Sequence, residues 1–232
     1  MTLSIIPVPG IGEVQAGMDL AMVILGALEA AGLDLEDHDI VVVTHKVVSK
    51  AEGAVASYGS DAEYQAIKER EATAVIRRRG DLMIAVTRQG FICANAGVDR
   101  SNVKPGQVVL HPRDPDRSAH RMRVRFELAT DKQLAVIVTD TFGRAWRRGL
   151  TDVAIGVSGM PAIHDYRGTT DTWGRELEVT EVAVVDEIAS AADLVMGKAD
   201  AVPVAIIRGL SWQEGEGRAT DLVRSPGEDL FR

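Results

Sequence analysis

The stretch Leu134-Ala135-Val136-Ile137-Val138-Thr139-Asp140-Thr141 joins an unbroken apolar run to a carboxylate and a hydroxyl. Six consecutive apolar or β-branched residues are typical of a strand that is buried on both faces. Asp140 and Thr141 then lie at the carboxyl end of that strand, which is where open sheets bind ligands. A second apolar run at residues 39–43 leads in the same way into Thr44-His45-Lys46. The sequence therefore predicts polar residues at the ends of two buried strands.

Other segments alternate between strand and helix patterns without a fixed repeat, and no low-complexity stretch marks a linker. We therefore treat residues 1–232 as a single domain, built as one compact unit or as two interlocked lobes. A small-residue stretch at 90–102 predicts a site loop. The predicted strands are residues 3–8, 39–43, 82–86, 108–111, 134–139 and 202–207, and the predicted helices are 18–31, 61–79, 115–129 and 181–197.

The composition excludes several classes of protein. A formal charge of -8 argues against a nucleic-acid binder, which usually carries a basic excess. The single cysteine, Cys93, cannot form an internal disulfide, so we expect a reducing compartment. The N-terminus has no leader pattern, and Glu29 interrupts the most apolar helix candidate, so we expect a cytoplasmic protein with no membrane partner.

Asp140 and Thr141 offer oxygen ligands of the kind that Mg²⁺ and Mn²⁺ prefer. The alternative is that Asp140 only caps the next element. The arginines that follow are Arg144, Arg147 and Arg148, expected within two turns of the acidic pair. Guanidinium groups bind phosphates and carboxylates in a bidentate manner, so an anionic substrate beside a metal is one interpretation, and a solvated basic stretch is the other.

Further candidates have equally plain alternatives. Asp99 and Asn102 offer a carboxylate and an amide, but Asp-Arg-Ser-Asn is also typical of an Asx turn. His45, Lys46 and Lys50 follow a strand and are candidates to bind phosphates, although such residues are commonly solvated or packed. The sequence contains no Walker A, H-E-x-x-H, C-x-x-C or G-x-S-x-G motif.

Taken together, several stretches resemble the coenzyme F420:γ-glutamyl ligase family over nearly the whole chain. They are residues 44–53, 96–102, 139–147, 175–177, 179–181, 186–187, 194–198 and 203–204. The resemblance implies an α+β fold with mixed sheets and flanking helices, assembled as an intertwined homodimer. It implies an enzyme that uses GTP with Mg²⁺ or Mn²⁺ to add L-glutamate to coenzyme F420-0 and then a γ-linked glutamate to F420-1, through an acyl phosphate. A role for K⁺ is left open, and 232 residues leave no room for the C-terminal reductase domain of some members.

The resemblance also assigns site residues. Asp99, Asp140 and Thr141 correspond to metal ligands, and Asp140, Arg144 and Arg147 are the candidate catalytic residues. Many members carry glutamine where this chain has Lys198, and an ammonium cannot ligate a metal, which puts a second metal position in question. The expected nucleotide contacts are Ile11, Gly12, Glu13, Val14, His45, Lys50, Asn102, Met196, Gly197 and Lys198.

Two rival functions remain. One is a ligase of the same fold that acts on another acid, since nothing in the residues themselves names the deazaflavin. The other is a regulatory module that binds GTP or a metal without turnover.

Overall fold

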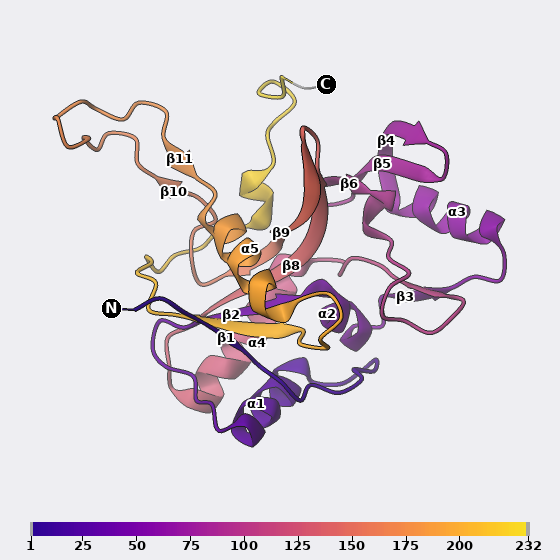
Figure 1. Ribbon diagram of the computed structural model, residues 1–232, viewed down its shortest axis with the longest axis horizontal. Helices are drawn as coiled ribbons and strands as arrows, with labels where there is room; N and C mark the ends of the chain where they lie inside the picture. The colour runs from indigo at the N-terminus through magenta and orange to yellow at the C-terminus, as the bar shows by residue number, and fades with distance from the viewer. Residues whose placement is uncertain (1, 231–232) are drawn as a thin grey trace.

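A computed structural model describes residues 2–230 of the chain. At its centre is a five-stranded mixed sheet in the order β1-β12-β2-β8-β9 (Figure 1). Only the β2–β8 pair is parallel among these strands, and each other neighbouring pair is antiparallel. The strands are β1 (Ser4–Pro7), β2 (Ile40–Thr44), β8 (Ala135–Arg144), β9 (Arg147–Ser158) and β12 (Val204–Arg208).

Three long helices cover this sheet. The helices α1 (Leu20–Ala31) and α4 (Pro115–Thr130) lie on one side, and α5 (Val184–Met196) lies on the other (Figure 1). Both faces of β2 and of the first half of β8 are therefore buried, as their continuous apolar sequences predicted. The short helix α2 (His45–Ala51) starts directly where β2 ends.

A second, smaller lobe lies beside the main sheet, at the right of Figure 1. It contains the sheet β4-β5-β6, formed by β4 (Ala72–Arg79), β5 (Leu82–Thr87) and β6 (Ile92–Ala94). Its other elements are α3 (Asp61–Glu71), the short turn η1 (Asn95–Gly97), and the pair β3 (Val55–Ser57) and β7 (Gln107–Val109). Separate small apolar clusters hold it together, around Met83 and around Tyr64.

The remaining chain forms an arm and a C-terminal segment. The arm is tied at its base by β10 (His164–Asp165) and β11 (Glu181–Val182) and extends away from the main sheet (Figure 1). The C-terminal segment contains one short helical turn, η2 (Ala219–Leu222), as expected for a loosely packed end. The α+β class with mixed sheets and flanking helices is therefore confirmed.

The predicted helix at 61–79 is wrong in its second half. The helix α3 ends at Glu71, and residues 72–79 form β4, which pairs with β5. The predicted helix at 181–197 also starts late, because Glu181 and Val182 belong to β11 and α5 begins at Val184. The other predicted strands and helices are confirmed within a few residues at their ends, except that β8 continues past Thr139 to Arg144.

Across residues 2–230, none of the helices combines the length and the apolar character needed to cross a bilayer.

A partly buried ion pair fastens β12 to the start of β2. Arg208 donates to Asp39 through Nε at 2.9 Å and Nη2 at 2.7 Å, and it also contacts Glu36 and the Asp34 carbonyl. The Asp39 side chain is 1% exposed. Its carboxylate therefore depends on Arg208 for charge compensation.

We expect Arg208→Gln to lower the free energy of unfolding by about 2–3 kcal/mol, because it leaves Asp39 buried without its cation. Arg125→Gln is the matched control, since Arg125 pairs with Asp19 at 3.5 Å and is 62% exposed; it should cost less than about 1 kcal/mol. Urea unfolding of both variants measures the difference, and equal losses would contradict the assigned role of Arg208.

Candidate functional site

The candidate site lies where β2 and β8 end. The two strands are parallel and in register, with Thr44 opposite Thr139. The next residues, His45 and Asp140, therefore leave the sheet side by side. His45 Nε2 lies 3.1 Å from Asp140 Oδ1. The sequence placed each residue at a strand end, and the structure brings them into contact.

A second imidazole binds the other oxygen of the same carboxylate. His111 Nε2 lies 2.7 Å from Asp140 Oδ2, and the two imidazole rings meet edge to face. The ring of Phe142 stacks on His111 at a centroid distance of 6.3 Å. The sequence analysis did not single out His111. Its only signal was its place as the last residue of the predicted strand 108–111, which says nothing about a partner 29 residues away.

The three side chains are almost completely removed from water. Exposure is 0% for His45, 4% for His111 and 11% for Asp140. Burial lowers the pKa of His45, although the Asp140 carboxylate opposes this effect. Burial would raise the pKa of Asp140, but the neighbouring imidazoles of His45 and His111 outweigh it and lower that pKa well below the ordinary value. Asp140 is therefore ionised at neutral pH.

Gly97 makes room for His111. A Cβ at Gly97 would lie 2.3 Å from His111 Cε1, and the φ of Gly97 is +73°. Only glycine has no side chain to clash there, and it adopts positive φ readily. The small-residue stretch at 90–102 thus approaches a histidine ring closely, as part of the predicted site loop.

Asp99 has a different set of partners. It accepts from Lys46 Nζ at 3.0 Å and from the Ser101 backbone N–H at 2.7 Å, so the local Asx-turn geometry is present. Burial raises the pKa of Asp99, but Lys46 and Ser101 outweigh it and lower the pKa. The backbone of Asp99 forms a bridge with Val109, two residues before His111. Asn102, the other candidate in this loop, is exposed.

Lys198 occupies a cluster of oxygens beside Thr141. Its ammonium lies 2.8 Å from Thr141 Oγ1, 2.7 Å from Asp152 Oδ1 and 2.6 Å from Asp193 Oδ1. Burial alone would lower the pKa of Lys198, but the hydrogen bonds to Asp152 and Asp193 outweigh it and raise the pKa. A positive charge thus already sits at this position. The sequence analysis gave no role to Asp152 or Asp193.

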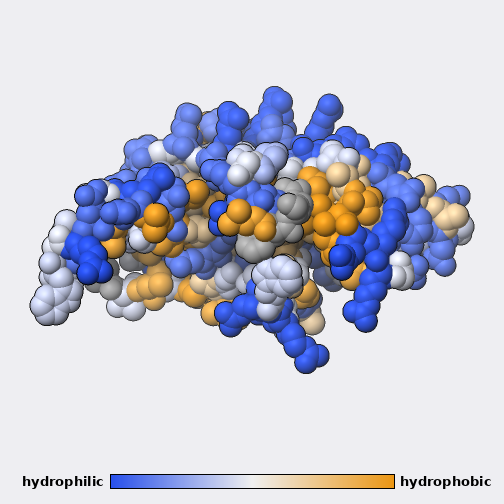
Figure 2. All heavy atoms as spheres, turned by 90° about the horizontal axis from the view of Figure 1, so that it is seen from above, coloured by the Kyte–Doolittle hydropathy of each residue, from blue (hydrophilic) through white to orange (hydrophobic). Residues whose placement is uncertain are grey.

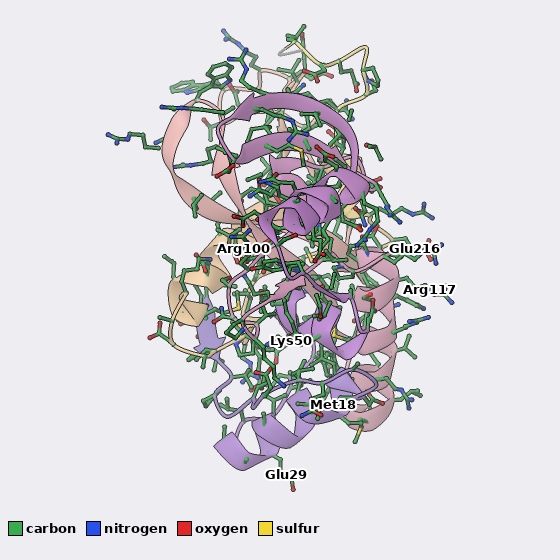
Figure 3. All side chains as sticks on the ribbon, turned by 90° about the vertical axis from the view of Figure 1, so that its right-hand side faces the viewer. Met18, Glu29, Lys50, Arg100, Arg117 and Glu216 are labelled. Atoms are coloured by element: carbon green, nitrogen blue, oxygen red, sulfur yellow. The ribbon has the colours of Figure 1, made fainter. Side chains whose placement is uncertain are left out.

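The other expected nucleotide contacts lie near the start of the chain and at the end of α5. Lys50 Nζ binds Glu13 Oε1 at 2.9 Å. Ile11 and Val14 are buried in the main core, and Gly12 and Glu13 are exposed. Figure 3 shows Lys50 between Met18, just before α1, and Arg100, on the side of the smaller lobe. Met196 is buried and Gly197 ends α5.

The expected helical spacing of the arginines is wrong. Residues 135–158 form the β8–β9 hairpin, and Arg144, Arg147 and Arg148 are exposed at its tip. Arg144 Nη2 donates to the Arg148 carbonyl at 2.6 Å. A strand rises about 3.3 Å per residue, so the hairpin carries these groups away from Asp140 rather than around it.

The family model described as F420-0:Gamma-glutamyl ligase matches residues 10–209. The chain belongs to this family. It is 43% identical to the coenzyme F420:L-glutamate ligase of Methanopyrus kandleri over 252 residues, which covers 100% of the chain and 98% of that protein. The relative of the same name from Methanothermobacter thermautotrophicus is 43% identical with complete coverage of both proteins, and that from Archaeoglobus fulgidus is 38% identical with 100% and 97% coverage.

Membership of the F420-0:γ-glutamyl ligase family confirms the resemblance inferred from the motifs, and identifies the chain as a member of a family of ligases. The matched region contains β2, β8 and the loop with Asp99, so the site described above lies inside it.

We expect Gly97→Ala to displace the His111 ring and to lower the free energy of unfolding. Gly90→Ala is the control, because Gly90 has a φ of +92° but a Cβ there would meet only Val223 at 3.6 Å. Both variants strain a backbone with positive φ, so the difference between their free energies of unfolding, about 1–3 kcal/mol, measures the clash with His111. Urea unfolding and the NMR shifts of the His111 ring measure it, and an unmoved ring would contradict the close packing.

Proposed function

We propose that this chain uses GTP to join L-glutamate to coenzyme F420-0, and then adds a γ-linked glutamate to F420-1. The names of its relatives support the acceptor and the amino acid. The observation that carries the proposal is Asp140, a buried carboxylate at the end of the apolar part of β8 that contacts the imidazoles of His45 and His111. Lys198 binds the adjacent Thr141. Such a site attracts a divalent cation and, through it, phosphates.

The chemistry proceeds in two steps. The γ-phosphoryl group passes from GTP to an oxygen of the acceptor carboxylate, and GDP leaves. The glutamate amine then attacks the acyl carbon, phosphate leaves, and the nitrogen loses a proton as the amide forms. Both steps bring anions together, so the main demand on the protein is to position them and balance their charge.

The residues present fit a divalent ion. Asp99, Asp140 and Thr141 offer hard oxygen ligands, and among residues 2–230 the ion-pair partners of the buried Asp140 carboxylate are the imidazoles of His45 and His111. One Mg²⁺ or Mn²⁺ ion there would screen the charge between nucleotide and acceptor. Lys198 supplies the second positive charge beside Thr141, in place of a second metal ion. A role for K⁺ stays open.

The lysines contact the phosphates in this proposal. Lys46 and Lys50 are paired with Asp99 and Glu13 in the structure. Coordination of the ion by Asp99 would release Lys46, whose ammonium then binds a phosphate oxygen. The other proposed nucleotide contacts are Ile11 to Val14, His45, Asn102 and Met196 to Lys198.

We also propose that the protein is a cytoplasmic homodimer. Figure 2 shows apolar patches between polar ones on the face seen from above. The exposed apolar side chains of the smaller sheet and of β9 are Val75, Ile76, Leu82, Ile92 and Leu150. Exposed apolar side chains that gather on neighbouring elements are typical of an interface. Packing against a second copy would bury them, and would bring Arg144 and Arg147 at the hairpin tip to the acidic acceptor of one of the two sites.

Sedimentation velocity tests the dimer. The wild type should sediment as a dimer, and Leu150→Glu should shift it toward the monomer because a charge would be buried at the interface. Leu128→Glu on α4 is the control, since Leu128 is 79% exposed on another surface. A monomeric wild type, or equal effects of both variants, would contradict the proposed interface.

Turnover distinguishes a ligase from a regulatory module that only binds GTP or metal. GDP formation should require both L-glutamate and F420-0, and mass spectrometry should show one and then further glutamates on the product. Binding of GTP without glutamate-dependent GDP would favour the module. GDP formation with another acid but not with F420-0 would favour the rival ligase of the same fold.

We expect Asp140→Asn to reduce glutamate-dependent GDP formation by more than roughly 100-fold. Loss of a residue that only hydrogen-bonds to a metal ligand costs up to about that much, and Asp140 is proposed to be a ligand itself. Asparagine keeps the shape but loses the charge, so the circular dichroism spectrum should stay native. Asp131→Asn is the control, at the left-handed end of α4 where asparagine fits. A rate like that of the wild type at saturating Mn²⁺ would remove Asp140 from the reaction.

A further inference from the structure

We propose that His45, His111 and Asp140 form a three-ligand site that selects a transition-metal ion, such as Mn²⁺, Fe²⁺, Co²⁺ or Zn²⁺, over Mg²⁺. The site shares Asp140 with the ligation proposed above, but ion binding can be measured without turnover. The added claim is that nitrogen ligands take part, supplied by His45 and His111.

The ligand atoms already have a spacing that suits one ion. One ring nitrogen from each histidine and one carboxylate oxygen of Asp140 lie within 4.8 Å of one another. Ligands about 2.1 Å from an ion and 90–109° apart are separated by about 3.0–3.4 Å. The His45–Asp140 distance of 3.1 Å falls within that range, and the His111–Asp140 distance of 2.7 Å needs only a small opening.

His45 Nε2 has no other task in the structure. It faces Asp140 but does not meet hydrogen-bond geometry with it, and it has no other partner among residues 2–230. The His45 side chain is 0% exposed, so water does not reach this atom freely. Buried polar atoms are normally paired, and an ion between His45 and Asp140 would satisfy this one.

The environment of the two imidazoles holds them in place for binding. Ser49 Oγ lies 3.5 Å from His45 Nδ1, one turn along α2. Gly97 and Phe142 confine the His111 ring from two directions. The three other histidines of the chain, His38, His120 and His164, are exposed. His45 and His111 therefore differ from the other three histidines in being buried and held by neighbouring groups.

The donor set determines the class of ion. Mg²⁺ prefers oxygen ligands and retains several waters. The later first-row ions accept imidazole as a ligand, and Zn²⁺ binds it better than Mn²⁺ does. Two imidazoles and one carboxylate leave further positions open on the ion, where Asp99, Thr141 or a phosphate oxygen can bind. A nucleotide could thus still reach the same ion.

Pulsed electron paramagnetic resonance of bound Mn²⁺ tests the nitrogen ligands directly. The wild type, stripped of metal and loaded with one equivalent of Mn²⁺, should show ¹⁴N coupling, and growth with ¹⁵N-labelled histidine should change it to ¹⁵N coupling. Mn²⁺ that binds without nitrogen coupling would overturn the proposal while leaving an oxygen-ligated ion for the ligase reaction. This experiment requires no variant, so it does not depend on a mutant that folds.

Calorimetric titration of the same apo protein supplies the second measurement. Zn²⁺ should bind at least tenfold more tightly than Mg²⁺. His111→Gln and His45→Gln should each weaken Zn²⁺ binding by more than roughly 100-fold and should change Mg²⁺ affinity little. Loss of a residue that only hydrogen-bonds to a metal ligand costs roughly 10- to 100-fold in affinity, so a larger loss indicates a direct ligand. His120→Gln, at an exposed position, should bind like the wild type. Unchanged Zn²⁺ affinity in both buried-site variants would overturn the proposal, whatever the ligase assay shows.

Discussion

Parallel pairing of β2 with β8 brings the candidate site together, because it aligns the ends of two buried strands. Thr44 lies opposite Thr139, so His45 and Asp140 leave the sheet at one edge. A shift of one residue would turn the alternating side chains to the opposite face and separate the pair. The apolar residues of both strands fix this register through burial between α4 and α5. Beyond this edge of the sheet, β8 continues into the hairpin with β9, and β2 is followed by α2.

The sequence predicted what depends on one segment at a time. Apolar runs identified β2, β8 and β12, and the polar residues after them marked the strand ends, including His45 and Asp140. His111 was missed because its role depends on a contact with Asp140 across 29 residues. Asp152 was given no role for the same reason: its partners Thr141 and Lys198 meet it only when β8 and α5 pack against β9. The resemblance to the family predicted site roles for Asp99 and Lys198. Composition and periodicity alone did not distinguish these two residues from ordinary turn and cap residues.

The wrong predictions share a physical cause. Residues 61–79 are rich in good helix formers, yet Thr73, Val75 and Ile76 interrupt them with β-branched side chains, and the turn at Gly80 and Asp81 allows 72–79 to pair with β5. Tertiary pairing thus outweighed a weak helical propensity. Beyond Thr139, β8 loses its apolar pattern, but β9 supplies a partner strand as far as Arg144. The hairpin therefore displays its arginines at an exposed tip.

The charges around the site bear on how a net-acidic chain would accept the anionic nucleotide that we propose. Lys46, Lys50 and Lys198 are each paired with a carboxylate: Asp99, Glu13, and Asp152 with Asp193. An anion arriving alone would have to compete with these carboxylates and would gain little. In the proposed function, Asp99 is one of the residues that would hold a divalent cation, and Lys46 would then be available to a phosphate. Cation and nucleotide should then bind cooperatively, since each makes available the partner that the other needs.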